Sequence, residues 1–558
     1  MKARIVLMFM LLTLGFPVKS PSQIIPRPAS FECGDGAFCI AGAPFYADSG
    51  CEAVCQIKDF AEKLSGASGK KSRIIRRPRS GAVCFLTEES LPPEAYSISI
   101  KKNGISVRAS SRRGFLYAIQ SLRQLLPSRI FSASSPCDIS PAGTGTESLQ
   151  DWNIPCAEIS DSPRFAYRGV LLDCARHYFT VDQIKEFLDI LAIYKVNHFH
   201  WHLTDDHAWR LEIKKYPRLT EVGGHNCGAL LESDPKVKGE VQYDGIYTQE
   251  QAREIVRYAD NLGIEVVPEI DMPSHMTAAL AAYPDLGCTR GPYEVIRVVG
   301  PRGKGLAKDA LCPGRDSTFT FVEDVLTEVM EIFPCEYIHV GGDECIKDRW
   351  YECPDCKARM EAEGIVSDSL YTSGQYLQTY FINRVRAFVN SRGREIIGWD
   401  EIIDGKLDHG ATVMSWRGKK TGIEASRRGF DVIMAPVEHC YLDYRQSREI
   451  DREPRAFAGT VTLEDVYCFN PTEGLTEEES SHIKGVQGNL WTDVIGIWSQ
   501  VEYMLLPRLA ALSEVQWCSP QRKDFDCFRK SMDSHEQIYK ACGYTYARHL
   551  WGIAGMED

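Results

Sequence analysis

The sequence predicts an α/β protein in which a (β/α)8 TIM barrel follows a small N-terminal α/β domain. Eight apolar runs in the second part of the chain have the length of buried strands, and segments of helical periodicity separate them. Polar and aromatic residues follow these runs. The loops after the strands are where such barrels place their active sites, so both observations favour the same fold.

Chain length and composition agree with this organisation. With 558 residues the chain is too long for one ordinary core, so we expect several domains. They are a signal peptide (1–20), a non-catalytic α/β domain (21–150), a catalytic barrel (161–517) and a C-terminal helix and tail (518–558). The formal net charge of −12 offers no basic face for a phosphate backbone, so nucleic acid is not an expected partner.

The N-terminal residues predict export. Lys2 and Arg4 precede an apolar run, 5–16, that fits a signal peptide and is too short to span a bilayer. An uncleaved N-terminal anchor is the alternative. We expect no other membrane span and a periplasmic, extracellular or lysosome-like compartment. The oligomeric state stays open.

Before the barrel, the sequence predicts a small sheet covered by a helix. Residues 96–100 and 105–109 have the pattern of strands and are joined by an Asn-Gly turn. Residues 113–126 place apolar side chains at helical spacing, so we expect this helix to bury one face on the sheet. Residues 127–151 are rich in Ser, Pro, Gly and Thr, which is typical of a linker.

The predicted barrel strands alternate with helices. The strands are residues 168–172, 196–200, 264–270, 337–340, 395–399, 412–416, 432–435 and 485–490. Thr180 and Gln183 form a capping box ahead of apolar residues at helical spacing, which indicates a helix after the first strand. Eight alternating units of this kind fit a (β/α)8 barrel.

Chemically active side chains follow the predicted strands one after another. They are Asp173 and Arg176 after the first strand, Asp205 and Asp206 after the second, Glu269, Asp271 and His275 after the third, Asp343 and Glu344 after the fourth, and Trp399, Trp416, Tyr441, Asp443, Trp491 and Asp493 after the later strands. Because these strand ends meet at one face of a barrel, we expect the side chains to surround one site.

Asp343 and Glu344 are adjacent and follow Gly341 and Gly342. Two carboxylates confined together are costly when both are charged, so one of them is suited to carry a proton as a general acid. The glycines would let a ligand approach the backbone closely. This combination suits the departure of a glycosidic oxygen. An exposed turn with two acidic residues is the alternative.

Trp399, Trp416 and Trp491 indicate a sugar-binding surface. Aromatic rings stack on the apolar faces of sugars, while carboxylates and arginine bind the hydroxyls. One tryptophan at a strand end is more typical of a core, but three beside charged residues favour sugar binding. We also expect Arg176 to bind hydroxyls instead of forming a surface ion pair, and His275 to join a proton network instead of the core.

Two patterns raise the question of a metal. His198, His200 and His202 share one face of a predicted strand, as in metal-dependent hydrolase barrels, although packed or hydrogen-bonded histidines are more common. Cys353 and Cys356 have C-x2-C spacing, but no second such pair follows nearby, so we expect a local disulfide or plain thiols. The expectation is therefore no metal and no other cofactor.

Four motifs together resemble one enzyme family. They are residues 168–176 (RGVLLDCAR), 200–206 (HWHLTDD), 268–273 (PEIDMP) and 339–344 (HVGGDE). On these motifs, residues 21–517 resemble the family 20 glycoside hydrolases, which are β-N-acetylhexosaminidases. The resemblance implies an exo-acting retaining enzyme that hydrolyses terminal non-reducing N-acetylglucosamine (GlcNAc) or N-acetylgalactosamine (GalNAc) from a glycan or oligosaccharide.

The resemblance also implies roles for the site residues. Glu344 would be the general acid and later the base, and Asp343 would orient the substrate's 2-acetamido group. The carbonyl oxygen of that group attacks the anomeric carbon to give an oxazolinium ion, and Tyr441 would hydrogen-bond this oxygen. The remaining assignments place Trp399, Trp416 and Trp491 around the acetamido group, Arg176, Asp443 and Asp493 on the sugar, and Asp205 and His275 behind Glu344.

The chain departs from the family pattern at two positions. Trp491-Thr492-Asp493 stands where the family usually has Trp-x-Glu, and the shorter carboxylate leaves the choice between GlcNAc and GalNAc open. Ser274 replaces a usual glycine before His275, a change that we expect to leave the histidine in place. The alternatives are a lacto-N-biosidase-like or chitinase-like glycosidase and an inactive sugar-binding barrel. The intact Asp343, Glu344 and Tyr441 set argues against an inactive barrel.

Overall fold

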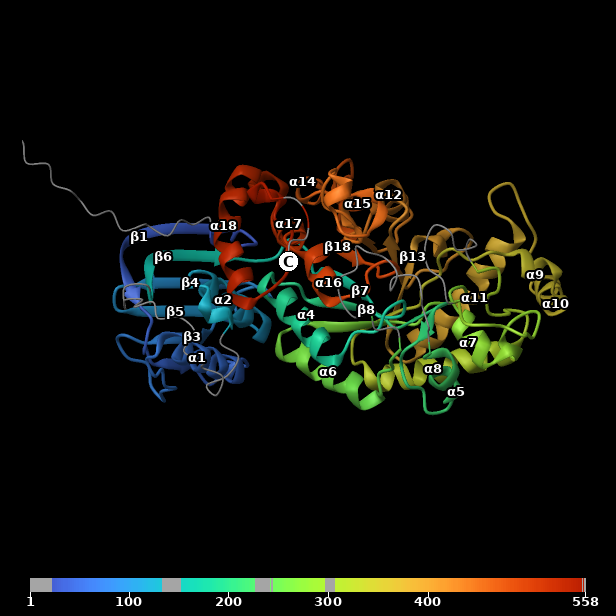
Figure 1. The fold of residues 1–558 in the computed structure, drawn as a ribbon, viewed down its shortest axis with the longest axis horizontal. Helices are drawn as coiled ribbons and strands as arrows, with labels where there is room; N and C mark the ends of the chain where they lie inside the picture. The colour runs from blue at the N-terminus through green and yellow to red at the C-terminus, as the bar shows by residue number, and fades with distance from the viewer. Residues whose placement is uncertain are drawn as a thin grey trace, which may run out of the picture.

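The computed structural model describes residues 23–132, 152–225, 241, 244–296, 307–553 and 555. The predicted signal peptide and most of the predicted linker lie outside these residues. A six-stranded sheet forms one end of the molecule, and a closed eight-stranded barrel with its helices forms the rest (Figure 1). The predicted order of a small α/β domain followed by a (β/α)8 barrel is therefore confirmed.

The N-terminal sheet has the strand order β1-β6-β4-β5-β3-β2. Its strands are β1 (Ser30–Cys39), β2 (Phe45–Ala47), β3 (Val83–Thr87), β4 (Tyr96–Lys101), β5 (Gly104–Ala109) and β6 (Asn153–Asp161). Helices α1 (Val54–Ser68) and α2 (Arg112–Gln124) pack on it, and α3 (Arg129–Ser132) follows. Strand β6 belongs to this sheet although all its residues except Asp161 fall between the ranges that we predicted for the two domains.

Buried charges join the sheet to the barrel. Lys195 Nζ lies 3.1 Å from Asp161 Oδ2 with both side chains fully buried, and Trp517 Nε1 donates to the same carboxylate at 2.8 Å. On the first barrel strand, Arg168 pairs with Glu94 of the N-terminal domain at 2.9 Å. Removing one partner from such a buried pair typically costs about 3–5 kcal/mol, so these contacts fix the two units to each other.

The barrel closes in the order β11-β12-β13-β14-β15-β18-β7-β8. Its strands, all parallel, are β7 (Tyr167–Asp173), β8 (His198–His202), β11 (Glu265–Glu269), β12 (Tyr337–His339), β13 (Glu395–Trp399), β14 (Ala411–Ser415), β15 (Val432–Met434) and β18 (Ile483–Leu490). Each overlaps a predicted run and differs from it by at most two residues at either end.

Helices cover the outside of the barrel. The longer ones are α4 (Val181–Ile193), α6 (Gln249–Asn261), α8 (Asp316–Ile332), α11 (Ser373–Ser391), α12 (Lys419–Arg427), α16 (Trp498–Leu505) and α17 (Arg508–Trp517). Thr180 caps α4 in the predicted capping box with Gln183. Val170 and Leu172 of β7 belong to the same large buried cluster as Ile184 of α4, whereas Leu171 belongs to a separate cluster inside the barrel. This alternation is the pattern expected of barrel strands.

Short elements lie in the loops between strands and helices. They are β9 (Thr204–Asp205), β10 (Ala208–Trp209), α5 (Arg218–Gly223), α7 (Thr277–Ala282), η3 (Pro284–Leu286), α9 (Asp348–Glu352), α10 (Pro354–Ala362), η4 (Asp400–Ile403), α13 (Val437–Cys440), β16 (Tyr444–Arg445), η5 (Ile450–Arg452), β17 (Phe457–Thr460), α14 (Leu463–Cys468) and α15 (Glu477–Ser481). After α17 come η6 (Pro520–Arg522), α18 (Phe525–Cys542) and η7 (His549–Trp551). No described helix is long and apolar enough to cross a bilayer.

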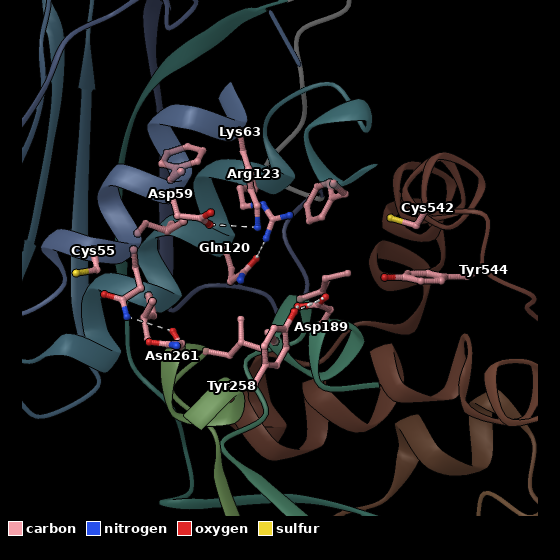
Figure 2. A pocket seen from close by; sticks show the side chains of 18 residues that line it. Cys55, Asp59, Lys63, Gln120, Arg123, Asp189, Tyr258, Asn261, Cys542 and Tyr544 are labelled. Carbon is pink, nitrogen blue, oxygen red and sulfur yellow. Dashed lines mark hydrogen bonds and ion pairs between the residues drawn. The ribbon is translucent and has the colours of Figure 1, made fainter. Parts of the chain in front are cut away.

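A cavity of about 480 Å³ lies where the N-terminal helices meet the barrel helices. Figure 2 shows Asp59 and Lys63 of α1, Arg123 of α2, and Asp189 and Tyr258 of the barrel helices around it. Lys63 pairs with Asp59 at 3.1 Å, Asp189 accepts a hydrogen bond from Tyr258 at 2.9 Å, and Arg123 donates one to Gln120 at 3.0 Å. None of the predicted site residues lines this cavity, so it belongs to the domain junction and not to the predicted site.

Candidate active site

The predicted site residues come together at the carboxyl end of the barrel strands. Asp173 and Trp399 are the last residues of β7 and β13, and Asp205 ends the short strand β9. Asp343 follows β12, and Trp491 follows β18. Parallel strands place these ends at one face, so residues more than 300 positions apart in the chain meet there.

Glu269, the last residue of β11, is the centre of a buried hydrogen-bond network. His202 Nδ1, His339 Nδ1 and Trp399 Nε1 lie 2.5, 2.9 and 2.9 Å from its carboxylate oxygens, and His200 Nε2 lies at 3.0 Å. Burial opposes the charge, but the histidines outweigh it and hold the pKa of Glu269 well below its usual value. Trp399 Nε1–H donates to this carboxylate, and ring nitrogens of His200, His202 and His339 lie around it.

The three histidines of β8 occupy successive layers of the barrel interior. His198 stacks on Tyr167 with ring centroids 4.2 Å apart, away from Glu269. His200 and His202 both contact Glu269. Only these two rings share a partner, so the triple-histidine pattern does not form one set of ligands. The predicted packed and hydrogen-bonded role describes their contacts.

Arg176 is held among carboxylates instead of at the surface. Its guanidinium nitrogens lie 3.1 Å from Asp173, 2.8 Å from Asp205 and 3.9 Å from Asp493. It also lies over the ring of Trp491, 5.2 Å from the centroid. Burial opposes the charge, but Asp205 and Asp493 raise the pKa of Arg176 well above its usual value. The result is a fixed cation at the strand ends.

His275 connects two pairs of carboxylates. Its Nδ1 lies 3.5 Å from Asp205 and 3.4 Å from Asp206, and its Nε2 lies 3.5 Å from both Asp343 and Glu344. Burial disfavours the protonated ring, but Asp205 and Asp343 outweigh this effect and raise the pKa of His275 well above its usual value. The ring is therefore a positive group that lies between Asp343 and Glu344 on one side and Asp205 and Asp206 on the other.

Gly341, which precedes the acidic pair, packs closely against a neighbouring carboxyl group. Gly341 has φ of 67°, and a Cβ there would lie 1.6 Å from Asp271 Oδ1. The missing side chain thus makes room for a neighbouring carboxyl. Glu344 itself has φ of 52°, which is unusual for a residue with a side chain. Ser274 also donates a hydrogen bond to the backbone carbonyl of Asp343.

The aromatic residues form one contiguous group. Trp399 and Trp491 have ring centroids 5.7 Å apart, and Trp416 stacks on Tyr441 at 6.2 Å and 25°. Trp399 is almost fully buried, whereas Trp416 and Trp491 are partly exposed. Trp399 is therefore the back of the site, and the two exposed rings are available to a ligand.

Two further acidic residues lie beside this group. Burial raises the pKa of Asp443 well above its usual value, and nearby Asp493 adds to the effect. Burial also raises the pKa of Asp493, with Arg176 acting against it. Within the described part of the chain, Asp443 Oδ1 and Asp343 Oδ1 are buried without a hydrogen-bond partner. Such orphaned acceptors suit a polar ligand.

The sequence patterns missed Glu401, which lies two residues after the predicted residue Trp399. Trp416 Nε1 donates to Glu401 Oε2 at 2.9 Å. Burial, with Asp343 and Asp400 as further causes, raises the pKa of Glu401 to about 8. Its position two residues after the strand-end Trp399 was the signal that could have found it.

Two family models match nearly the whole chain. The model of the catalytic domain of glycosyl hydrolase family 20 covers residues 165–520, and that of domain 2 of the same family covers residues 21–162. The chain belongs to glycosyl hydrolase family 20. The resemblance seen in the four sequence motifs is therefore confirmed.

Relatives in this family are β-hexosaminidases. The β-hexosaminidase of Porphyromonas gingivalis is 39% identical over 92% of this chain, which spans 62% of that protein's length. A β-N-acetylhexosaminidase structure from Bacteroides fragilis is 32% identical, with a TM-score of 0.77, and covers 96% of this chain and 99% of its own.

The family 20 exo-β-N-acetylglucosaminidase of Vibrio harveyi, solved in complex with GlcNAc, has a TM-score of 0.79 at 28% identity. That match covers 95% of this chain and 79% of its own. The family relationship establishes a glycoside hydrolase, and the roles of the individual site residues remain predictions.

Proposed function

We propose that this chain is an exo-acting retaining β-N-acetylhexosaminidase whose nucleophile is the acetamido oxygen of the substrate. The observation that carries the proposal is the contact of one buried histidine, His275, with both Asp343 and Glu344 at 3.5 Å. This arrangement places an acid and a second carboxylate side by side, next to aromatic rings, at the face where barrels carry out catalysis.

The two carboxylates have different surroundings, which supports different roles. The side chain of Glu344 is 34% exposed, and that of Asp343 is 15% exposed. Glu344 can thus reach the glycosidic oxygen and give it a proton as the leaving group departs. The free Oδ1 of Asp343 can accept the acetamido N–H and stabilise the positive charge that develops on the ring.

The reaction then needs no nucleophile from the protein. The acetamido carbonyl oxygen attacks the anomeric carbon as the bond to the leaving group breaks, which gives an oxazolinium ion. Glu344, now ionised, takes a proton from water, and that water attacks the anomeric carbon and restores the acetamido group. Two displacements retain the anomeric configuration. Tyr441 would donate a hydrogen bond to the acetamido oxygen from beside Trp416.

The remaining polar groups suit the hydroxyls of a terminal sugar. Arg176 is a fixed donor, and Asp443 Oδ1 and Asp493 are acceptors at the same strand ends. The GlcNAc in the V. harveyi relative supports GlcNAc as a substrate here. The shorter Asp493 leaves room for GalNAc as well.

Hydrolysis of chromogenic glycosides tests this function. We expect cleavage of the 4-nitrophenyl β-glycosides of GlcNAc and GalNAc, and no cleavage of the plain β-glucoside and β-galactoside. Release of GlcNAc from the non-reducing end of chitin oligosaccharides would show exo action. Release of disaccharides would indicate a biosidase-like or chitinase-like enzyme, and no cleavage of any substrate would indicate a binding protein. Either result would overturn the proposal.

We also propose that the protein is exported. The support is the sequence alone, in which Lys2 and Arg4 accompany the apolar run 5–16. N-terminal sequencing of the protein purified from its native cells tests this. A new N-terminus near residue 20 is expected, and an intact Met1 in the cytoplasmic fraction would contradict export.

A further inference from the structure

Four cysteines from three separate segments meet at one point of the barrel periphery. Cys288 follows η3, Cys312 precedes α8, and Cys353 and Cys356 flank the start of α10. Their sulfur atoms all lie within 4.8 Å of one another. Helices α9 and α10 lie at the end of the molecule farthest from the N-terminal sheet (Figure 1). The group is therefore remote from the domain junction.

The spacing of the sulfurs differs from that of disulfides. Cys312 Sγ lies 3.8 Å from Cys353 Sγ and 3.5 Å from Cys356 Sγ, and Cys356 Sγ lies 3.7 Å from Cys288 Sγ. Disulfides would divide the four sulfurs into two exclusive pairs, whereas here Cys312 and Cys356 each have two near neighbours. The local disulfide that we considered for Cys353 and Cys356 is absent, because both are free thiols.

The observed distances match a tetrahedral metal site. With zinc-to-sulfur bonds of about 2.3 Å, the corners of a tetrahedron lie about 3.8 Å apart. We propose that Cys288, Cys312, Cys353 and Cys356 bind one structural Zn²⁺ ion through their thiolates. A complete set of four protein ligands leaves no open position for water or substrate, so the ion would be structural and would take no part in the hydrolysis.

The neighbouring residues support thiolate ligands. Arg315 lies beside the sulfur of Cys312, and its Nε is 3.2 Å from Asp355 Oδ2. Four thiolates around Zn²⁺ carry a net negative charge, which this guanidinium would partly balance. Three of the four cysteines are buried, and Cys288 is partly exposed. Burial limits exchange of the ion, and the exposed edge leaves a path by which it can enter.

A glycine makes the close approach of the segments possible. An ideal Cβ on Gly314 would lie 2.3 Å from the carbonyl carbon of Asp355 and 2.4 Å from the backbone nitrogen of Cys356. Both contacts are with backbone, which cannot move aside as a side chain can. A side chain at position 314 would thus push Cys312 away from the Cys353–Cys356 turn.

The site would tie together the two loops that carry the catalytic groups. Leu311 N, next to Cys312, donates to Pro273 O at 2.9 Å, two residues before His275. Leu311 O accepts a hydrogen bond from Trp350 Nε1 at 3.0 Å, and Trp350 lies in the loop that follows Glu344. Zinc at this point would hold the loop after β11 against the loop after β12, and thereby stabilise the positions of His275 and Glu344.

Metal analysis of the full-length protein is the first test. Protein produced with zinc in the medium should contain about one zinc ion per chain after dialysis. Alkylation of the native protein, followed by peptide mass spectrometry, should leave these four cysteines unmodified until the metal is removed. Protein without zinc, two disulfides among these cysteines, or iron in place of zinc would each overturn the proposal. The parent protein gives this answer even if every cysteine variant fails to fold.

Variants test the ligand set. Cys288→Ala and Cys356→Ala should lose zinc, whereas the matched controls Cys84→Ala, partly exposed, and Cys335→Ala, buried, should retain it. Gly314→Ala keeps all four sulfurs and should bind zinc more weakly.

A strong chelator should lower the melting temperature of the parent by several degrees and should have little effect on Cys356→Ala, because a ligand that binds only the folded state stabilises it. Equal zinc contents in all variants would exclude this set of ligands.

Discussion

His275 Nε2 lies 3.5 Å from Glu344 Oε2, and both residues have left-handed backbone, with φ values of 53° and 52°. Such a conformation costs about 1–3 kcal/mol for a residue with a side chain and persists only where neighbouring contacts enforce it. Ser274, which bonds to the backbone of Asp343, supplies one of these contacts. The acid and its cationic partner are therefore positioned by two strained loops that hold each other.

Replacing Glu344 by glutamine keeps the shape of the side chain and removes its proton. For Glu344→Gln we expect kcat on oligosaccharides to fall by about 10²–10⁴-fold, the usual contribution of a general acid. A glycoside with 2,4-dinitrophenol as leaving group should lose much less in its first step, because that phenol departs without a proton. Steady-state kinetics on both substrates measure the difference. Exposed Glu331→Gln on α8 is the control, and equal losses on both substrates would contradict the role as acid.

The charge on His275 should make stability depend on pH. Its pKa in the folded protein is raised well above 6.5, because Asp205 and Asp343 outweigh the opposing effect of burial. When folding raises the pKa of a histidine, its protonation stabilises the folded state fully at pH values below the pKa of the unfolded state. This stabilisation is lost as the pH rises through the pKa of the folded state. The loss of unfolding free energy in His275→Asn should thus be largest below the ordinary histidine pKa of about 6.5 and should shrink as pH rises above it.

Urea unfolding at several pH values measures this loss directly. Exposed His409→Asn is the control and should show a small difference that stays constant with pH. If the loss of unfolding free energy in His275→Asn increased with pH, the proposal that His275 carries a positive charge between the carboxylates would be wrong.

Glu401 should give the parent protein a second pH dependence. Burial, together with Asp343, raises its pKa from 4.5 to about 8. The folded state therefore holds this proton more tightly than the unfolded state does. The stability that this proton contributes is complete below the pKa of the unfolded state and is lost as the pH rises through about 8. Glu401→Gln cannot ionise, and its Oε1 can still accept the hydrogen bond from Trp416.

We accordingly expect Glu401→Gln to become more stable relative to the parent between about pH 5 and about pH 8, in unfolding experiments at fixed ionic strength. Exposed Glu424→Gln on α12 should show no such trend. A constant difference for Glu401→Gln would mean that Glu401 is ionised throughout this range.

Asp493 should influence the choice between the two acetamido sugars. Its Oδ1 lies 3.9 Å from Arg176 Nε, at the edge of an ion-pair contact. Asp493→Glu extends the carboxylate by one methylene and should change the ratio of kcat/KM for the GlcNAc and GalNAc glycosides by about tenfold, since a hydrogen bond to a charged group contributes about 1.5–3 kcal/mol. Exposed Asp526→Glu should leave the ratio unchanged. An unchanged ratio in Asp493→Glu would assign sugar selection to other residues.

The barrel could be predicted because its strands are short apolar runs with polar ends. Strand β13 matches the predicted residues 395–399, and β7 extends the predicted run by one residue at each end. Strand β6 was missed because its pairing with β1, more than 100 residues earlier, is not visible in local sequence. Local patterns report burial and periodicity, whereas strand pairing across a long separation depends on the whole fold.

The site shows the same limit. Its members could be chosen from their positions after strands, but contacts such as Asp271 against Gly341 depend on packing between loops. The cysteine group was missed because Cys288 and Cys312 are far from the C-x2-C pair in sequence and have no spacing motif of their own. Local cysteine spacing therefore predicts a disulfide or plain thiols where the fold assembles four sulfurs.

The most direct test of the catalytic proposal is the rate of hydrolysis of 4-nitrophenyl β-N-acetylglucosaminide and its mono-, di- and trifluoroacetamido analogues. Fluorine withdraws electrons from the carbonyl oxygen that is proposed to attack the anomeric carbon. We predict that kcat/KM falls with each fluorine, by more than about 100-fold over the series, or about 2.7 kcal/mol of activation free energy. Rates that are independent of fluorination would show that a group of the protein is the nucleophile, and would contradict the account.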